Sequence, residues 1–160
     1  MKESKSAPIS EITLVVPEHT AYLSVVRQAV ASAAGLMGFD ATAILQLQMA
    51  IDEACINVIE HGSRGMGSSF IKLKLQPLPE KLVMHVHDRC ERFSPLEREL
   101  PDLNDYFNAP SQRGLGLVIL RKFVDEIDHS YRANSGNKLC LTKYLPGRLP
   151  EGDRPAAPHS

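Results

Sequence analysis

The amino-acid sequence predicts a two-layer α/β (α+β) sandwich, with a mixed, mostly antiparallel sheet of about five strands and three helices on one face. Two observations lead to this fold class. Short stretches in which apolar and polar residues alternate are typical of half-buried strands, and longer stretches with apolar residues every three to four positions are typical of amphipathic helices. They follow one another as strand, helix, helix, two strands, long loop, helix, two strands.

The first half of the chain is predicted to form one strand and two helices. The strand is "EITLVV", which ends at "PEH". Helical spacing follows from Thr20 to Leu36, and Gly35 and Gly38 are expected to end this helix. Asp40 is the predicted N-cap of a second helix that ends near Gly62. Its expected core face is Ile44, Leu47, Ile51, Ala54 and Val58.

The second half is predicted to form two strand pairs around a long loop and a helix. "SSFIKLKLQ" and "KLVMHVHD" alternate at period two on either side of "PLPE". Residues 89–112 are rich in prolines and charges, and a loop of this length in a small domain is more often a lid or binding loop than filler. "RGLGLVILRKFVDEI" resumes helical spacing, and "IDHSYRA" and "KLCLTKYL" are expected to form the last strands.

Length and composition limit what kind of protein this is. A chain of 160 residues with 43% hydrophobic residues suits one domain, which we expect at residues 9–146, between a flexible N-terminus (1–8) and a disordered tail (147–160). A net charge of −1 without long basic runs gives no sign of direct nucleic-acid binding. Three widely spaced cysteines and the absence of a signal peptide or membrane-spanning run predict a reduced, cytoplasmic protein that binds no membrane.

One edge of the second helix carries polar residues that its core face does not require. At 100° per residue, Glu53, Asn57 and His61 lie on one stripe beside the apolar face. An asparagine oxygen suits Mg²⁺, and a carboxylate one turn earlier could orient or deprotonate a hydroxyl near the metal. The alternative is a solvated helix edge, because such triplets are common.

Two later motifs, at Asp88 and at "QRGLGL", also contain residues that the fold alone does not require. Asp88 ends its strand on the apolar face, where a carboxylate needs a donor, which can be a ligand amine such as that of adenine or a nearby backbone amide. In "QRGLGL", Gly114 and Gly116 precede the third helix, with Arg113 adjacent. Free amides there could hold a phosphate, or the glycines could only let the chain enter the helix from a tight turn.

Taken together and in order, these motifs resemble the ATP site of the GHKL superfamily, which includes gyrase and histidine-kinase catalytic domains. "DEACINVIEHG" is similar to the N box of its anti-sigma-factor serine/threonine kinases, "DRCERFSP" to their first glycine box, and "RGLGLVILRKFVDEI" to their second. The resemblance covers residues 9–146 and implies the Bergerat ATP-binding fold, with residues 89–112 as the lid over the nucleotide.

The resemblance also implies a role for each matched residue. Asn57 would coordinate Mg²⁺ at the ATP phosphates, Glu53 would be the catalytic residue that positions or activates the attacking hydroxyl, and Asp88 would accept the adenine amine. The other nucleotide-binding positions would be Cys90, Arg113, Gly114, Leu115, Gly116 and Leu117. Such a kinase phosphorylates an anti-sigma-factor antagonist (a STAS-like protein), exchanges it for a sigma factor, and is usually a homodimer.

Cys90 departs from the pattern, because the family has glycine there. A cysteine could narrow the adenine pocket or reroute the turn, or its side chain could simply turn outward. The alternative function is therefore a catalytically weak or inactive module that keeps the fold and sequesters a sigma factor or antagonist. A detached histidine-kinase domain is disfavoured, because the chain has no room for a dimerising phosphoacceptor helix pair.

Overall fold

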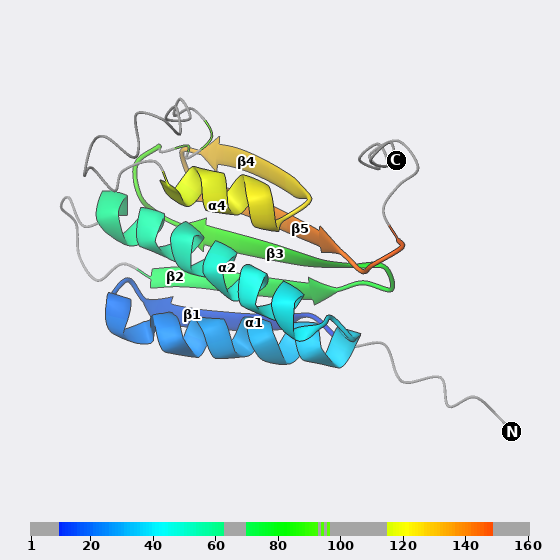
Figure 1. Ribbon diagram of the computed structural model, residues 1–160. Coiled ribbons are helices and arrows are strands. Elements are labelled where there is room, and N and C mark those ends of the chain that lie inside the picture. The colour runs from blue at the N-terminus through cyan, green and yellow to red at the C-terminus, as the bar shows by residue number, and fades with distance from the viewer. Residues whose placement is uncertain (1–9, 63–69, 93, 95, 97–114, 149–160) are drawn as a thin grey trace, which may run out of the picture.

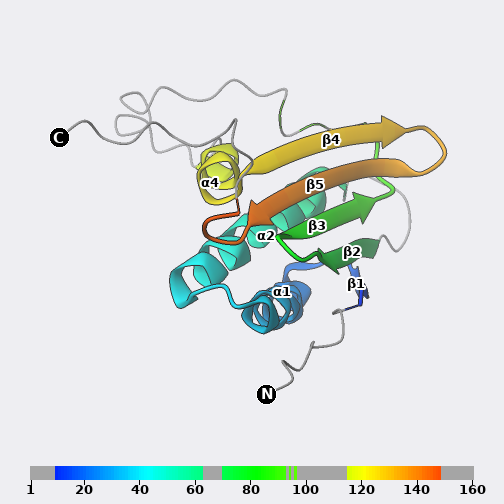
Figure 2. The same cartoon turned by 90° about the vertical axis from the view of Figure 1, so that its right-hand side faces the viewer.

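The structure is a computed structural model that describes residues 10–62, 70–92, 94, 96 and 115–148. Within them, a five-stranded sheet in the order β1-β2-β3-β5-β4 carries three α-helices on one face (Figures 1 and 2). The strands are β1 (Ile12–Pro17), β2 (Phe70–Pro77), β3 (Lys81–Asp88), β4 (Glu126–Arg132) and β5 (Gly136–Tyr144). The helices are α1 (Leu23–Met37), α2 (Ala41–Gly62) and α4 (Leu115–Phe123), and a 3-10 turn, η1 (Thr20–Tyr22), precedes α1. The predicted two-layer sandwich is confirmed.

All pairings in the described sheet are antiparallel, so the mostly antiparallel sheet that the sequence predicts contains no parallel pair here. The hairpins β2–β3 and β4–β5 each reverse the chain, and the antiparallel pairing of β3 with β5 joins them. One row of paired residues runs across the whole sheet beneath the helices: Ile12, Leu75, Met84, Leu141 and Ile127.

Local signals set the ends of the first two helices. Gly38 has φ 90° and caps α1, so the expectation that Gly35 also ends this helix is wrong. A left-handed cap needs positive φ, which Gly38 supplies, whereas Gly35 lies inside α1. The prediction that Asp40 caps α2 is confirmed, because the Ala43 N–H donates to Asp40 Oδ1 (2.8 Å).

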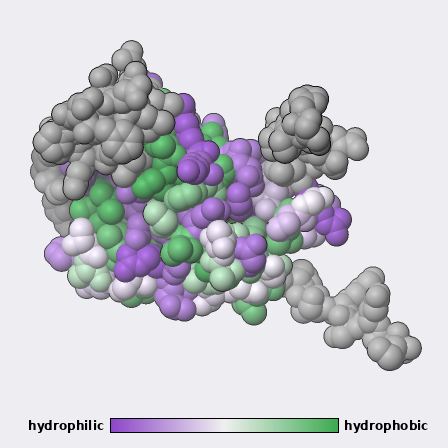
Figure 3. Space-filling model, viewed as in Figure 1, coloured by the Kyte–Doolittle hydropathy of each residue, from purple (hydrophilic) through white to green (hydrophobic). Residues whose placement is uncertain are grey.

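The core lies between α2 and the central strands. Of the predicted core face of α2, Leu47, Ile51, Ala54 and Val58 are buried and Ile44 is partly buried against them. The face that carries the helices presents hydrophobic and hydrophilic residues side by side (Figure 3), and α2 itself exposes Leu45. Among the described helices, none is both long and apolar enough to cross a membrane.

Candidate functional site

The polar edge of α2 meets the first turn of α4, which packs beside it (Figure 1). The closest approach is at Gly116, where a Cβ atom would overlap Glu53 Oε2 and lie 3.9 Å from Asn57 Nδ2. Only a glycine lets the α4 backbone come this close to both side chains without moving one of them. The structure therefore brings together three predicted site residues from two motifs that are far apart in the chain.

Glu53 and Asn57 are both half-buried, and neither forms a hydrogen bond or ion pair with a described residue. Burial raises the pKa of the Glu53 carboxyl, and the negative charges of Glu60 and Asp52 raise it further. A carboxylate whose pKa is raised is, once ionised, a stronger proton acceptor than one with an ordinary pKa. This end of the site thus holds a basic carboxylate beside a free carboxamide.

These groups fit a magnesium ion that is held together with phosphate. The Asn57 amide oxygen is a hard oxygen ligand of the kind that Mg²⁺ prefers, and the Glu53 carboxylate lies near the same α4 turn. Within the described part of the chain there is no cluster of three or more histidine, cysteine or acidic residues that could hold a metal. A single amide oxygen suits an ion that takes most of its ligands from phosphate oxygens and water. The first amide groups of α4, from Leu115, have no partners inside the helix and belong to the turn that approaches Glu53 and Asn57 at Gly116.

Asp88 lies at the end of β3, only 7% exposed, as its strand periodicity predicts. Its Oδ1 accepts hydrogen bonds from the Cys90 N–H (2.8 Å) and from Asn137 Nδ2 (2.8 Å). Asn137 Nδ2 also donates to the Glu91 carbonyl (3.0 Å). The other carboxylate oxygen, Oδ2, has no hydrogen bond within the described residues and remains available to a ligand amine.

Asn137 is the residue that sequence reasoning missed, because it lies in the polar segment between the last two predicted strands, "IDHSYRA" and "KLCLTKYL". In the sheet it is the direct partner of Asp88, and it is only 4% exposed. The preceding Gly136 has φ 81°, and a Cβ atom there would collide with the Asp88 carbonyl and lie 2.7 Å from Arg89 Cα. A glycine-asparagine pair opening a strand, opposite a strand that ends in aspartate, is the signal that could have identified it.

Cys90 takes up none of the conformations that require glycine, because no described non-glycine residue has positive φ. Its side chain is half-buried at the edge of the core, with Sγ 3.8 Å from Glu18 Oε2, so it does not turn outward to solvent. Burial, with the negative charges of Asp88 and Glu18, raises the thiol pKa to about 12. The thiol is therefore protonated and unreactive at neutral pH.

The remaining predicted positions divide into two groups. Arg113, Gly114 and most of the lid loop at 89–112 lie outside the described residues. Leu117 is buried in the core, and His61 is half-buried in the last turn of α2. The expected domain limits at 9–146 stay a prediction.

Asp125 and Glu126, near the end of the motif "RGLGLVILRKFVDEI", make contacts that hold the fold together. Asp125 accepts a hydrogen bond from the Tyr144 N–H (2.7 Å) and pairs with Lys143, and Glu126 accepts one from the Tyr144 hydroxyl. Both carboxylates therefore hold the junction between α4 and β4 against the end of β5.

The chain is similar to several known proteins. The family model described as "Histidine kinase-like ATPase domain" matches residues 16–143. The serine-protein kinase RsbW of Bacillus velezensis is 26% identical over 147 residues, which covers 89% of this chain and 90% of that protein. RsbW of Listeria innocua is 29% identical over 140 residues, covering 84% and 87%.

A solved structure has the same fold. It is the crystal structure of the RsbU and RsbW domains of Rv1364c from Mycobacterium tuberculosis, with a TM-score of 0.62 and 20% sequence identity. The match covers 89% of this chain but 35% of that one, so the chain spans about a third of the length of this structural relative. At this identity the similarity shows the fold alone.

Proposed function

The chain belongs to the histidine kinase-like ATPase domain family, and on this premise we propose that it is a cytoplasmic serine/threonine kinase that uses Mg-ATP to phosphorylate an anti-sigma-factor antagonist. The observation that carries the proposal is the contact of Gly116 with Glu53 and Asn57. It sets a carboxylate and a carboxamide beside the helix start whose amides would hold phosphate. The likeness to proteins named serine-protein kinases over nearly their whole length supports the choice of reaction.

Each residue would have one task in the transfer. Asn57 would give an amide oxygen to Mg²⁺, and the first amides of α4 would hold phosphate oxygens. Glu53 would accept the proton of the substrate hydroxyl as its oxygen attacks the γ-phosphorus and the bond to ADP breaks. Asp88 Oδ2 would accept a hydrogen bond from the adenine amine. Phosphoryl transfer requires mainly positioning and charge neutralisation, and bound magnesium would supply the second.

The proposed output is partner switching. A phosphate on the antagonist adds negative charge to its docking surface and weakens its binding to the kinase, which is then free to hold a sigma factor. A homodimer is part of this proposal.

Calorimetric titration with ATP, with and without Mg²⁺, tests nucleotide binding. We expect metal-dependent binding in the micromolar range, about 8 kcal/mol of binding free energy. Asn57→Ala should lose it while keeping the wild-type unfolding temperature. Gln46→Ala, about three turns earlier on the same stripe, is the matched control and should bind as wild type does. Equal affinity for Asn57→Ala and wild type would remove the metal-ligand role.

Phosphoryl transfer to a candidate antagonist is the second test. Glu53→Gln should bind Mg-ATP and fail to form phosphoserine or phosphothreonine. Phosphohistidine on the partner would instead point to a histidine kinase.

The departure at Cys90 favours one alternative function, a module that binds the sigma factor or antagonist without catalysis. No nucleotide binding by wild type, together with tight partner binding, would establish it. Cys90→Gly would then show whether a glycine restores the affinity for ATP.

A further inference from the structure

The face of the sheet opposite the helices forms a second surface of the molecule. None of the described helices lies over this open face, as the side view shows (Figure 2). Residues that alternate with the core positions of β2, β3 and β5 point into it. The surface is therefore a separate layer from the one that holds Glu53 and Asn57.

Basic residues form a row near one end of the open face. The strand register pairs Lys72 with His87 and His87 with Lys138, so these three side chains stand side by side on β2, β3 and β5. Arg132, exposed at the end of β4 and paired with Gly136, extends the row onto a fourth strand. Since neighbouring strands are about 4.8 Å apart, Lys72 and Lys138 start about 10 Å from each other.

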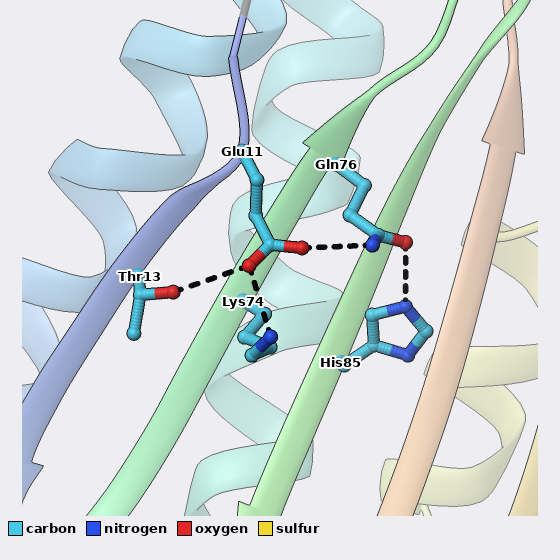
Figure 4. A network of polar contacts seen from close by, with 5 residues as sticks. All are labelled: Glu11, Thr13, Lys74, Gln76 and His85. Carbon is cyan, nitrogen blue, oxygen red and sulfur yellow. Dashed lines mark hydrogen bonds and ion pairs between the residues drawn. The ribbon is translucent and has the colours of Figure 1, made fainter.

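The cations of this row have no counter-ion among the described residues. Lys72, Lys138 and Arg132 form no ion pair with any described residue. Lys74, two residues further along β2, does have a counter-ion, because Glu11 Oε1 lies 2.9 Å from Lys74 Nζ (Figure 4). Figure 4 shows that Glu11 also joins Thr13, Gln76 and, through Gln76, His85 in one network in front of the sheet.

The acidic groups of the open face lie elsewhere. Glu11 is held by Lys74 and Gln76, and Glu126 accepts the Tyr144 hydroxyl. Asp128 pairs with Cys140, two residues along β5 from Lys138, and forms no ion pair with Lys138. The face thus has an uncompensated basic end and an acidic end whose carboxylates are largely engaged.

The positive charge of the basic row affects the pKa values of two histidines on β3, His87 and His85. Burial lowers the pKa of His87, and the positive charges of Lys138 and Lys72 lower it further. Burial and Lys138 lower the pKa of His85 in the same way. Like charges that stand together on a sheet are destabilising, so the isolated protein carries an electrostatic cost that a bound anion would remove.

We propose that the basic row, defined as Lys72, His87, Lys138 and Arg132, docks an acidic segment of a partner protein. Charge complementarity selects the partner, because the row offers separate cations that have no counter-ion in the described part of the chain, which suits carboxylates spaced along an extended chain. The docking surface is independent of the nucleotide site and of the proposed kinase activity, since the two lie on opposite sides of the sheet.

Fluorescence anisotropy with a labelled deca-glutamate peptide tests the proposal directly. We expect the peptide to bind at about 0.02 M salt and to bind more weakly at about 0.2 M salt, because salt screens exposed charges over roughly a Debye length. The double variant Lys72→Glu/Lys138→Glu should lose at least tenfold in affinity. Arg121→Glu/Lys122→Glu, which makes the same charge change on exposed residues of α4, should retain it.

Three results would overturn the proposal. They are no binding of the peptide to wild type at low salt, equal losses in the two double variants, and tighter binding of a single-stranded DNA of the same charge than of the peptide. The last would assign the row to nucleic acid. Calorimetry with Mg-ATP should give the same affinity for Lys72→Glu/Lys138→Glu as for wild type, so this test is independent of the kinase proposal.

Discussion

The two ends of the candidate nucleotide site differ in how their polar groups are satisfied. Where α2 meets α4, Glu53 and Asn57 have no hydrogen bond to a described residue. Where β3 meets β5, Asp88 is already held by Asn137 and by the Cys90 N–H. Water can satisfy a half-buried polar group when no ligand is bound, whereas a buried carboxylate needs hydrogen-bond donors from the protein itself. The first end is thus suited to exchanging charged groups, and the second to presenting a fixed edge to a neutral base.

Gly136→Ala should have the largest effect on stability, because it disturbs the backbone at the end of the site where Asn137 holds Asp88. The new Cβ would need positive φ and would collide with the Asp88 carbonyl, which we expect to lower the unfolding free energy by about 2–4 kcal/mol. Gly38→Ala is the control, since Gly38 also has positive φ but nothing within 4 Å of its Cβ position. It should cost about 1–2 kcal/mol. Equal losses in urea unfolding would show that the close contact with β3 is unimportant.

Asn137→Ala should have the next largest effect. It leaves the buried Asp88 carboxylate without one donor and should cost about 1–3 kcal/mol of unfolding free energy. Because the carboxylate then loses its orientation, the preference for ATP over ITP, which lacks the exocyclic amine, should also fall in calorimetric titrations. Asn134→Ala, exposed in the same turn, is the control and should change neither quantity. An unchanged ATP preference would argue against a role of Asp88 in reading the base.

Gly116→Ala tests the other end, where we expect a large functional effect with a small effect on stability. The methyl group would displace only the Glu53 carboxylate, the far end of a flexible side chain, and alanine favours a helix by up to about 1 kcal/mol. Phosphoryl transfer should fall at least tenfold while the unfolding free energy changes by less than about 1 kcal/mol. Gly35→Ala in α1, whose Cβ would make only a 4.0 Å contact with Ile44, should leave transfer unchanged. Full activity of Gly116→Ala would contradict the placement of Glu53 in the reaction.

Glu53→Gln should have the smallest effect on stability, and it should stabilise the protein where Gly136→Ala and Asn137→Ala destabilise it. The folded state raises the pKa of this carboxyl above its usual 4.5, so folding is penalised when pH rises through the folded-state value and the group ionises. At pH 7 the variant should be more stable than wild type, by less than about 1 kcal/mol because solvent screens a half-buried group. The advantage should vanish below about pH 4.5 in urea unfolding. An equal difference at pH 7 and pH 4 would show that burial of the charge is not the cause.

Much of the fold could be predicted from neighbouring residues along the chain. The core face of α2, its Asp40 cap and the inward side of β3 follow from periods of 3.6 and 2 and from one side-chain hydrogen bond, all of which act within a few residues. The error at Gly35 has the same origin, because two glycines three residues apart both suit a helix end and only the backbone shows which has positive φ.

Sequence alone thus determined the order of the elements, the faces they bury and the family that the motifs resemble, because these depend on local periodicity and on short motifs. Only the tertiary structure decided which polar groups meet. The hydrogen bond from Asn137 to Asp88 spans 49 positions, and Gly116 faces Glu53 only because α4 packs on α2. The basic row likewise exists only through the register of four strands. Contacts of this kind arise when packing brings distant segments together, and no local pattern encodes the distance between them.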